Sequence, residues 1–132
     1  MKRRNFKRFI RNIGYAFLLF FVLSCQDNEN QNDSLTVLQA LFEEIQTLAN
    51  SVACTDAAEW TFVSYGAKAC GGPQGYIAYS NQIDVGYFLS LIEEYTTAER
   101  EYNIRWGIVS TCDLPAIPTE VSCQNGEAVL IY

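Results

Sequence analysis

The cysteines of this 132-residue chain are its residues best suited to chemistry. The chain contains no histidine, which excludes a histidine-based catalytic triad, a histidine metal site and a histidine pH switch. Its five cysteines are Cys25, Cys54, Cys70, Cys112 and Cys123. Four thiolates could bind zinc, but such a site would use C-x-x-C spacing, which the sequence lacks. We therefore expect the cysteines to form disulfides or to be modified, with no metal and no cofactor.

Paired carboxylates could offer a second kind of chemistry, because glycosidases use two carboxyl groups that face each other across a cleft. The candidate pairs are Glu93 with Glu94 and Glu99 with Glu101. Neighbouring residues on a helix point about 100° apart, so their side chains do not converge on one substrate. We expect these residues to form a solvated helix face instead. No evident base could activate a serine or threonine nucleophile, and the sequence therefore favours a protein without catalytic activity.

The stretch from Gly66 to Ser80 is the best candidate for a binding surface. Its four glycines and one proline allow the backbone to turn sharply and to approach another surface closely. Lys68, the only lysine after Cys25, could meet a carboxylate there. Tyr76 and Tyr79 could stack on a sugar or a peptide, or they could cover the core, which is the interpretation we favour. The candidate binding residues are Lys68, Gly71, Gly72, Pro73, Tyr76 and Tyr79.

The amino-terminal residues have the order of a secretory signal peptide. Six basic residues fall within the first eleven positions, and an apolar run follows from Ile13 to Leu23. This run is shorter than the roughly 20 residues of a membrane-spanning helix. The string Val22-Leu23-Ser24-Cys25 resembles the lipobox of bacterial lipoproteins. The resemblance implies cleavage before Cys25, a diacylglyceryl group on its thiol and an acylated, palmitate-type amino terminus; an uncleaved signal anchor is the alternative.

The residues after Cys25 indicate where such an anchor would lie. An aspartate directly after the lipidated cysteine would resemble an inner-membrane retention signal. This chain has Gln26 at that position, so the outer membrane is favoured. Gln26-Asp27-Asn28-Glu29 is similar to the acidic stretch of surface-exported lipoproteins of the Bacteroidota, although the periplasmic face stays possible. Residues 26–33 have nothing to bury and predict a solvated tether of roughly 30 Å. Asp33-Ser34-Leu35 resembles an O-glycosylation acceptor sequence of the same bacterial group, but we expect Ser34 to be a helix N-cap.

A second resemblance covers residues 60–123. The string Gly-Ala-Lys-Ala-Cys-Gly-Gly-Pro at residues 66–73 is followed by Tyr-Ile-Ala-Tyr-Ser and later by Gly-Ile-Val-Ser-x-Cys. This order is similar to a group of small exported lipoproteins of the Bacteroidota. The resemblance implies a common fold and no catalytic residue.

The apolar spacing predicts one small α+β domain. We expect a signal peptide at residues 1–24, a lipidated cysteine with a polar tether at 25–34 and a globular domain at 35–132. Apolar residues three and four positions apart predict a helix from Leu35 that closes at Cys54. The same pattern predicts a second helix from Asp84 to about Trp106. We expect these two amphipathic helices to pack on one face of a short antiparallel sheet.

Strand signals are shorter and include a carboxyl-terminal hairpin. Aromatic and β-branched residues predict strands at 60–65 and 108–111. Asn125-Gly126 is a strong signal for a two-residue turn between strands at 120–123 and 128–132, because both turn positions need positive φ. This turn would set Cys123 opposite Ala128.

Cysteine counting predicts disulfides. If Cys25 is lipidated, four cysteines remain in an exported chain of about one hundred residues, which is typical of a disulfide-stabilised domain. Four cysteines allow three connectivities. We expect Cys54 to pair with Cys70 and Cys112 with Cys123, because both bridges would close short segments.

Charge and loop chemistry together suggest a function. After Ser24 the chain has three basic and 15 acidic residues, a net charge of −12 against −6 for the whole chain, which argues against a nucleic-acid partner. We expect a non-catalytic binding module on the outer membrane that recognises a protein or glycan through residues 66–80 and 115–118. A protease or lysozyme inhibitor is one version. The alternative is an envelope-assembly subunit that binds another outer-membrane protein; the oligomeric state stays open.

Overall fold

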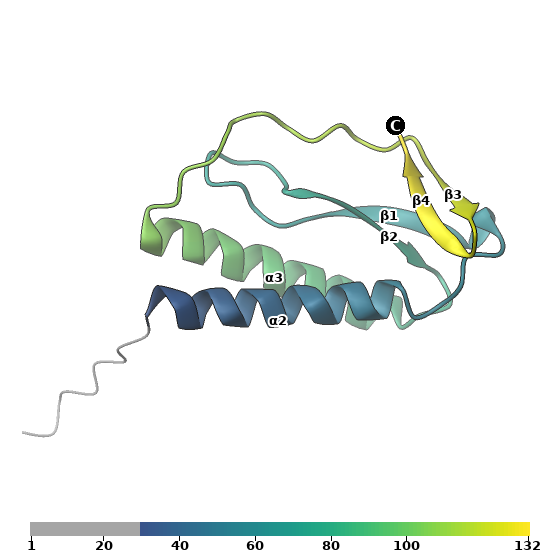
Figure 1. The fold of residues 1–132 in the computed structure, drawn as a ribbon, viewed down its shortest axis with the longest axis horizontal. Helices are drawn as coiled ribbons and strands as arrows, with labels where there is room; N and C mark the ends of the chain where they lie inside the picture. Colours follow the sequence, from purple (N-terminus) through teal and green to yellow (C-terminus); the bar gives the residue numbers. More distant parts are fainter. Residues whose placement is uncertain (1–29) are drawn as a thin grey trace, which may run out of the picture.

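The computed structural model describes residues 30–132, which form two layers (Figure 1). Helices α2 (Gln31–Ala49) and α3 (Val85–Trp106) lie side by side beneath two antiparallel sheets of two strands each. The predicted α+β class is confirmed, with two small sheets in place of the single sheet expected. The predicted signal peptide, the lipidation at Cys25 and the first residues of the tether lie outside the described residues.

Helix α2 begins earlier and ends earlier than predicted. Its N-cap is Asn30, whose side chain accepts a hydrogen bond from Asp33 N at 3.0 Å, and Ser34 lies in the first turn. The prediction of Ser34 as the cap and of residues 31–33 as tether is therefore wrong, because a capped helix can extend by one exposed turn beyond its packed face. The helix ends at Ala49, before Cys54.

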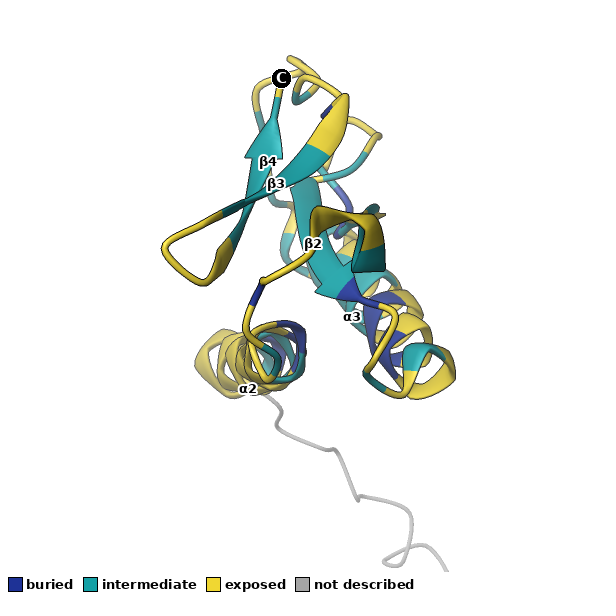
Figure 2. Ribbon diagram, turned by 90° about the vertical axis from the view of Figure 1, so that its right-hand side faces the viewer, coloured by how far each residue is buried: buried dark blue, intermediate teal, exposed yellow. Residues whose placement is uncertain are grey.

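Helix α3 follows its prediction and supplies the centre of the core. Asp84 caps it by accepting a hydrogen bond from Tyr87 N at 3.0 Å, and Gly107 ends it in the left-handed conformation with a φ of 60°. Its inner face packs against α2 and the strands above (Figure 2). The buried core residues are Ile45, Ala49, Phe88, Leu91 and Ile92.

The first sheet pairs β1 (Trp60–Tyr65) with β2 (Gly75–Ser80). The short helix η1 (Ala57–Glu59) precedes β1. Strand β1 is as predicted, but the expectation of one loop from Gly66 to Ser80 is wrong in its second half. Tyr-Ile-Ala-Tyr has β-forming side chains, and pairing with β1 places Ile77 and Tyr79 against the core.

The second sheet is the predicted hairpin of β3 (Glu120–Gln124) and β4 (Glu127–Ile131). Asn125 and Gly126 have positive φ values of 53° and 84°, and Cys123 lies opposite Ala128 as expected. The strand predicted at residues 108–111 does not form. This segment lies beside a glycine-rich loop with left-handed backbone at Gly71 and Gly72, which offers no regular strand edge.

One disulfide joins Cys54 to Cys123, with their Cα atoms 5.2 Å apart. The predicted pairs Cys54–Cys70 and Cys112–Cys123 are therefore wrong. The hairpin returns to the segment after α2, where Cys54 N donates a hydrogen bond to Gly126 O at 2.8 Å. The two cysteines are 69 positions apart in sequence, and the fold brings them together. An argument from short loops cannot predict such a pair.

Candidate functional site: a loop joined to a strap

Two irregular segments touch at the end of the domain opposite the hairpin. The first is loop 66–74 between β1 and β2, and the second is residues 107–119 between α3 and β3, which we call the strap. The strap leaves α3, passes the loop and runs to β3 on the side of β1 and β2 away from the helices (Figure 1). Predicted binding residues Lys68, Gly71, Gly72 and Pro73 all belong to this loop.

Helix α3 holds the loop from below. Glu99 accepts hydrogen bonds from Ala67 N at 2.5 Å and from the Gln74 side chain at 3.2 Å. Thr96 accepts from the backbone N–H of Gly66, and the Asn103 side chain donates to Ala67 O at 2.7 Å. Because residues three and four apart share one face of a helix, α3 presents a polar row to the loop backbone.

This polar row was not predicted from the sequence. We expected Glu99 on a solvated helix face, whereas Glu99 is half-buried. A signal was present, because Glu99 alone interrupts the apolar stripe of α3 and stands three positions after Thr96 and four before Asn103. The prediction is confirmed for Glu93, Glu94 and Glu101, which are all exposed.

Glu99 also affects two tyrosines beneath the loop. The Tyr95 hydroxyl donates to Glu99 at 3.2 Å. Burial first, and then the negative charge of Glu99, raise the pKa of Tyr95 well above its ordinary value. The same two causes raise the pKa of Tyr65. Both rings pack on Phe42 of α2, so the polar row continues directly into the core.

Lys68 reaches the strap and not open solvent. Its ammonium donates to Asp113 O at 2.5 Å and lies 3.4 Å from the carboxylate of the same residue. The Lys68 side chain is only 12% exposed. Hydrogen bonds with Thr111 and with Lys68 lower the pKa of the Asp113 carboxyl. We expected a ligand to supply the carboxylate that pairs with Lys68, but Asp113 of the same chain supplies it.

The two central glycines of the loop have different roles. Both have positive φ, 96° at Gly71 and 85° at Gly72, which favours glycine at each position. A Cβ atom at Gly71 would meet nothing within 4 Å, whereas one at Gly72 would overlap the Leu114 side chain. Gly72 thus allows the strap to approach the loop closely. Pro73 beside it is half-buried.

Cys70 and Cys112 lie together where the loop and the strap touch. The Cys70 sulfur is 3.5 Å from Ser110 Oγ and 3.5 Å from Thr111 O, the carbonyl that directly precedes Cys112. Both thiols are free and exposed. Hydrogen bonds with Cys112 and then with Ser110 lower the pKa of Cys70, whereas the bond with Cys70 raises the pKa of Cys112.

The strap exposes apolar side chains on a fixed backbone. Val109 is 90% exposed, Leu114 68% and Ile117 69%, and Ile104 in the last turn of α3 is also exposed. A shallow cavity of about 290 Å³ adjoins this surface. Its lining residues are Lys68, Ala69, Gly71, Arg100, Asn103, Ile104 and Ile108.

The predicted tyrosines lie on strand β2, outside the loop. Tyr79 packs its ring 4.8 Å from that of Phe88, in agreement with the favoured interpretation that it covers the core. Tyr76 lies edge-on to Phe62 with ring centroids 6.0 Å apart. Tyr79 is therefore part of the core, whereas Tyr76 is half-buried on the opposite face of β2.

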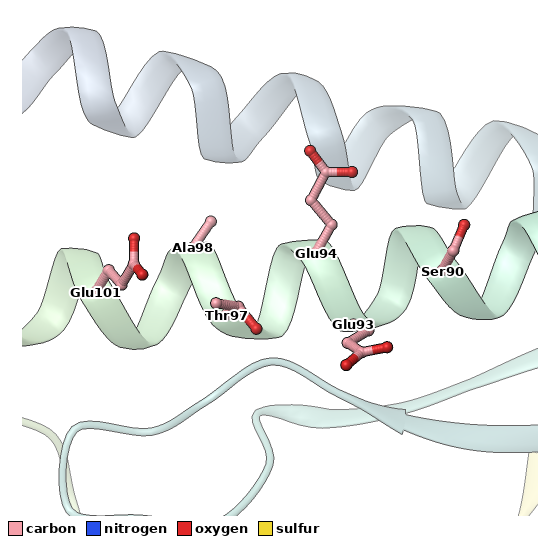
Figure 3. A pocket seen from close by; sticks show the side chains of 6 residues that line it. All are labelled: Ser90, Glu93, Glu94, Thr97, Ala98 and Glu101. Carbon is pink, nitrogen blue, oxygen red and sulfur yellow. The ribbon is translucent and has the colours of Figure 1, made fainter.

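A second depression runs along α3 on the helical side and is lined by acidic residues. Glu93 and Glu94 point to different sides of the helix, as their adjacency predicts (Figure 3). No group of three or more metal-ligating side chains occurs within residues 30–132. The carboxylates here do not converge on one point.

Comparisons with protein-family models, curated proteins and solved structures find no match to this chain. Among the helices of residues 30–132, neither α2 nor α3 is long and apolar enough to cross a membrane. The site must therefore be interpreted from its own geometry.

Proposed function

We propose that this chain is a lipid-anchored, non-catalytic binding module of the bacterial outer membrane that recognises a protein partner through its strap. The observation that carries the proposal is the exposure of Val109, Leu114 and Ile117 on a backbone held in place by the loop. Several large exposed apolar side chains on one short segment are typical of protein interaction sites. The lipobox-like string at Cys25 supports the anchor.

The chemistry of the strap favours a protein over a glycan. Sugars are commonly bound by stacking on exposed aromatic rings, and residues 107–119 contain no aromatic side chain. Branched aliphatic side chains instead suit an apolar pocket on another protein. The ion pair and hydrogen bond between Lys68 and Asp113 restrain the strap near its middle, which reduces the conformational entropy lost on binding.

The proposal can be tested by photo-crosslinking on whole cells. A photoreactive p-benzoylphenylalanine replaces the exposed Ala116 in the full chain, and crosslinked products are compared in three backgrounds. The backgrounds are the natural sequence, Val109→Ser with Ile117→Ser, and Val37→Ser. Val37 is the matched control, because it is 57% exposed and apolar but lies on α2.

We expect one discrete crosslinked protein whose yield falls at least tenfold in the double variant and is unchanged in Val37→Ser. Equal yields in all three backgrounds would overturn the strap assignment. A second chain carries the probe at Val37 in place of Ala116; a discrete product from that position, and none from Ala116, would favour the envelope-assembly alternative with a helix face as the interface.

A further inference from the structure

We propose that Cys70 and Cys112 form a second disulfide, nested inside the Cys54–Cys123 bridge, and that this second bridge is reversible and fastens the strap to loop 66–74. The two sulfurs meet where the loop already touches the strap through Lys68. The importance of this fastening for partner binding rests on the proposed function, but the chemistry does not.

Geometry brings the two thiols together before any bond forms. The loop side is fixed by hydrogen bonds from Lys68 N to Gly72 O and from Gly71 N to Lys68 O, both at 2.9 Å. The strap side is fixed by the ion pair of Asp113, the neighbour of Cys112 in sequence. Cys70 N also lies 3.4 Å from Ser110 Oγ. The backbone segments that carry the two cysteines therefore already touch, through Lys68 and through Cys70 with Ser110.

The two bridges differ in their access to solvent. Cys54 is 2% exposed and Cys123 is half-buried, so a dissolved thiol reaches the Cys54–Cys123 bridge less easily. Cys70 and Cys112 are both exposed. Exposed disulfides exchange readily, whereas buried structural disulfides resist reduction. In sequence, Cys54–Cys123 is the outer bridge and Cys70–Cys112 the inner bridge. The outer bridge therefore serves as permanent scaffold, and the inner bridge responds to the redox conditions around it.

The two cysteines have different roles in the exchange. The hydrogen bonds that lower the pKa of Cys70 favour its thiolate form. This thiolate attacks the disulfide of a disulfide-donating oxidoreductase or of oxidised glutathione. That attack breaks the oxidant's S–S bond, forms a mixed disulfide and releases one thiolate. Cys112 then loses its proton and attacks the Cys70 sulfur, which closes the protein bridge and releases the second thiolate. Two electrons and two protons leave the protein in total.

The experiment maps the bridges in the full-length protein in detergent after equilibration with glutathione buffers of increasing reducing strength. Alkylation and non-reducing digestion with trypsin and a glutamate-specific protease separate the four cysteines after Cys25, because cleavage follows Glu59, Lys68, Arg105 and Glu120. The outer bridge links fragments 45–59 and 121–127. The inner bridge links fragments 69–93 and 106–120.

We expect the inner-bridge product under oxidising buffer and its loss under conditions that leave the outer-bridge product intact. In Cys112→Ser, Cys70 should instead accumulate as a mixed disulfide with glutathione. Hydrogen exchange of residues 107–119 should be slower in the oxidised protein than in the reduced protein.

Three results would overturn the proposal. One is the absence of the inner-bridge product under oxidising buffer, and another is the opening of both bridges at the same buffer composition. The third is identical hydrogen exchange of the strap in both redox states. These results do not depend on a binding partner, so they are distinguishable from failure of the crosslinking experiment.

Discussion

Removal of the Cys54–Cys123 bridge should be the most damaging single change to this domain. The bridge closes a segment of 69 positions, for which the loop-closure relation gives about 4.4 kcal/mol at 25 °C. A domain of this size has a total stability of roughly 5 to 15 kcal/mol. The hairpin forms its own sheet without ladder pairing to β1 or β2, so packing and the hydrogen bond from Cys54 N to Gly126 O would have to hold it without the bridge.

The measurement compares residues 30–132 carrying Cys70→Ser and Cys112→Ser with the same chain that also carries Cys54→Ala and Cys123→Ala. Urea unfolding at 25 °C should show a loss of about 4 kcal/mol, and the melting temperature should fall by roughly 15 to 30 °C. A loss below about 1 kcal/mol, with an unchanged dependence on urea, would refute the reasoning that the bridge restricts the unfolded chain.

Two further predictions concern the loop. Gly71→Ala and Gly72→Ala should each destabilise the domain by about 1 to 2 kcal/mol in urea unfolding, because both positions have positive φ. The two losses should differ by less than about 1 kcal/mol, because the new methyl group at Gly72 meets only the end of the exposed Leu114 side chain, which can rotate away; a much larger loss at Gly72 would contradict this. Raised pKa values at Tyr65 and Tyr95 mean that the free energy of unfolding falls as pH rises above 10. Glu99→Gln should lower the Tyr95 midpoint in an ultraviolet titration without restoring 10, since burial remains, while Glu101→Gln should not move it.

Local patterns predicted the regular elements well. Helix α3 has its cap at Asp84 and its stop at Gly107, and both signals depend on neighbouring residues only. The hairpin register follows from Asn125-Gly126 for the same reason. Strand β2 was missed because the glycines before it resemble a continuing loop, although its own side chains favour a strand.

The site was predicted in composition but not in its contacts. The glycine-rich loop with Lys68 is indeed the irregular region that meets another surface, but that surface is the strap. Contacts between positions 68 and 113, or 54 and 123, depend on how the layers pack, and no local pattern encodes them. Exposed apolar residues such as Val109 are of types that favour strands. Only the fold shows that their segment has no partner strand.

The pairing of Cys54 with Cys123 has a consequence for biogenesis. If the chain is exported as proposed, it emerges amino end first, so Cys54 enters the oxidising space together with Cys70 long before Cys123 arrives. An oxidase acting on thiols in order of emergence would join consecutive cysteines, which is not the native arrangement. Maturation therefore needs either delayed oxidation or a disulfide isomerase, and cells without isomerase activity should accumulate misbridged, protease-sensitive protein.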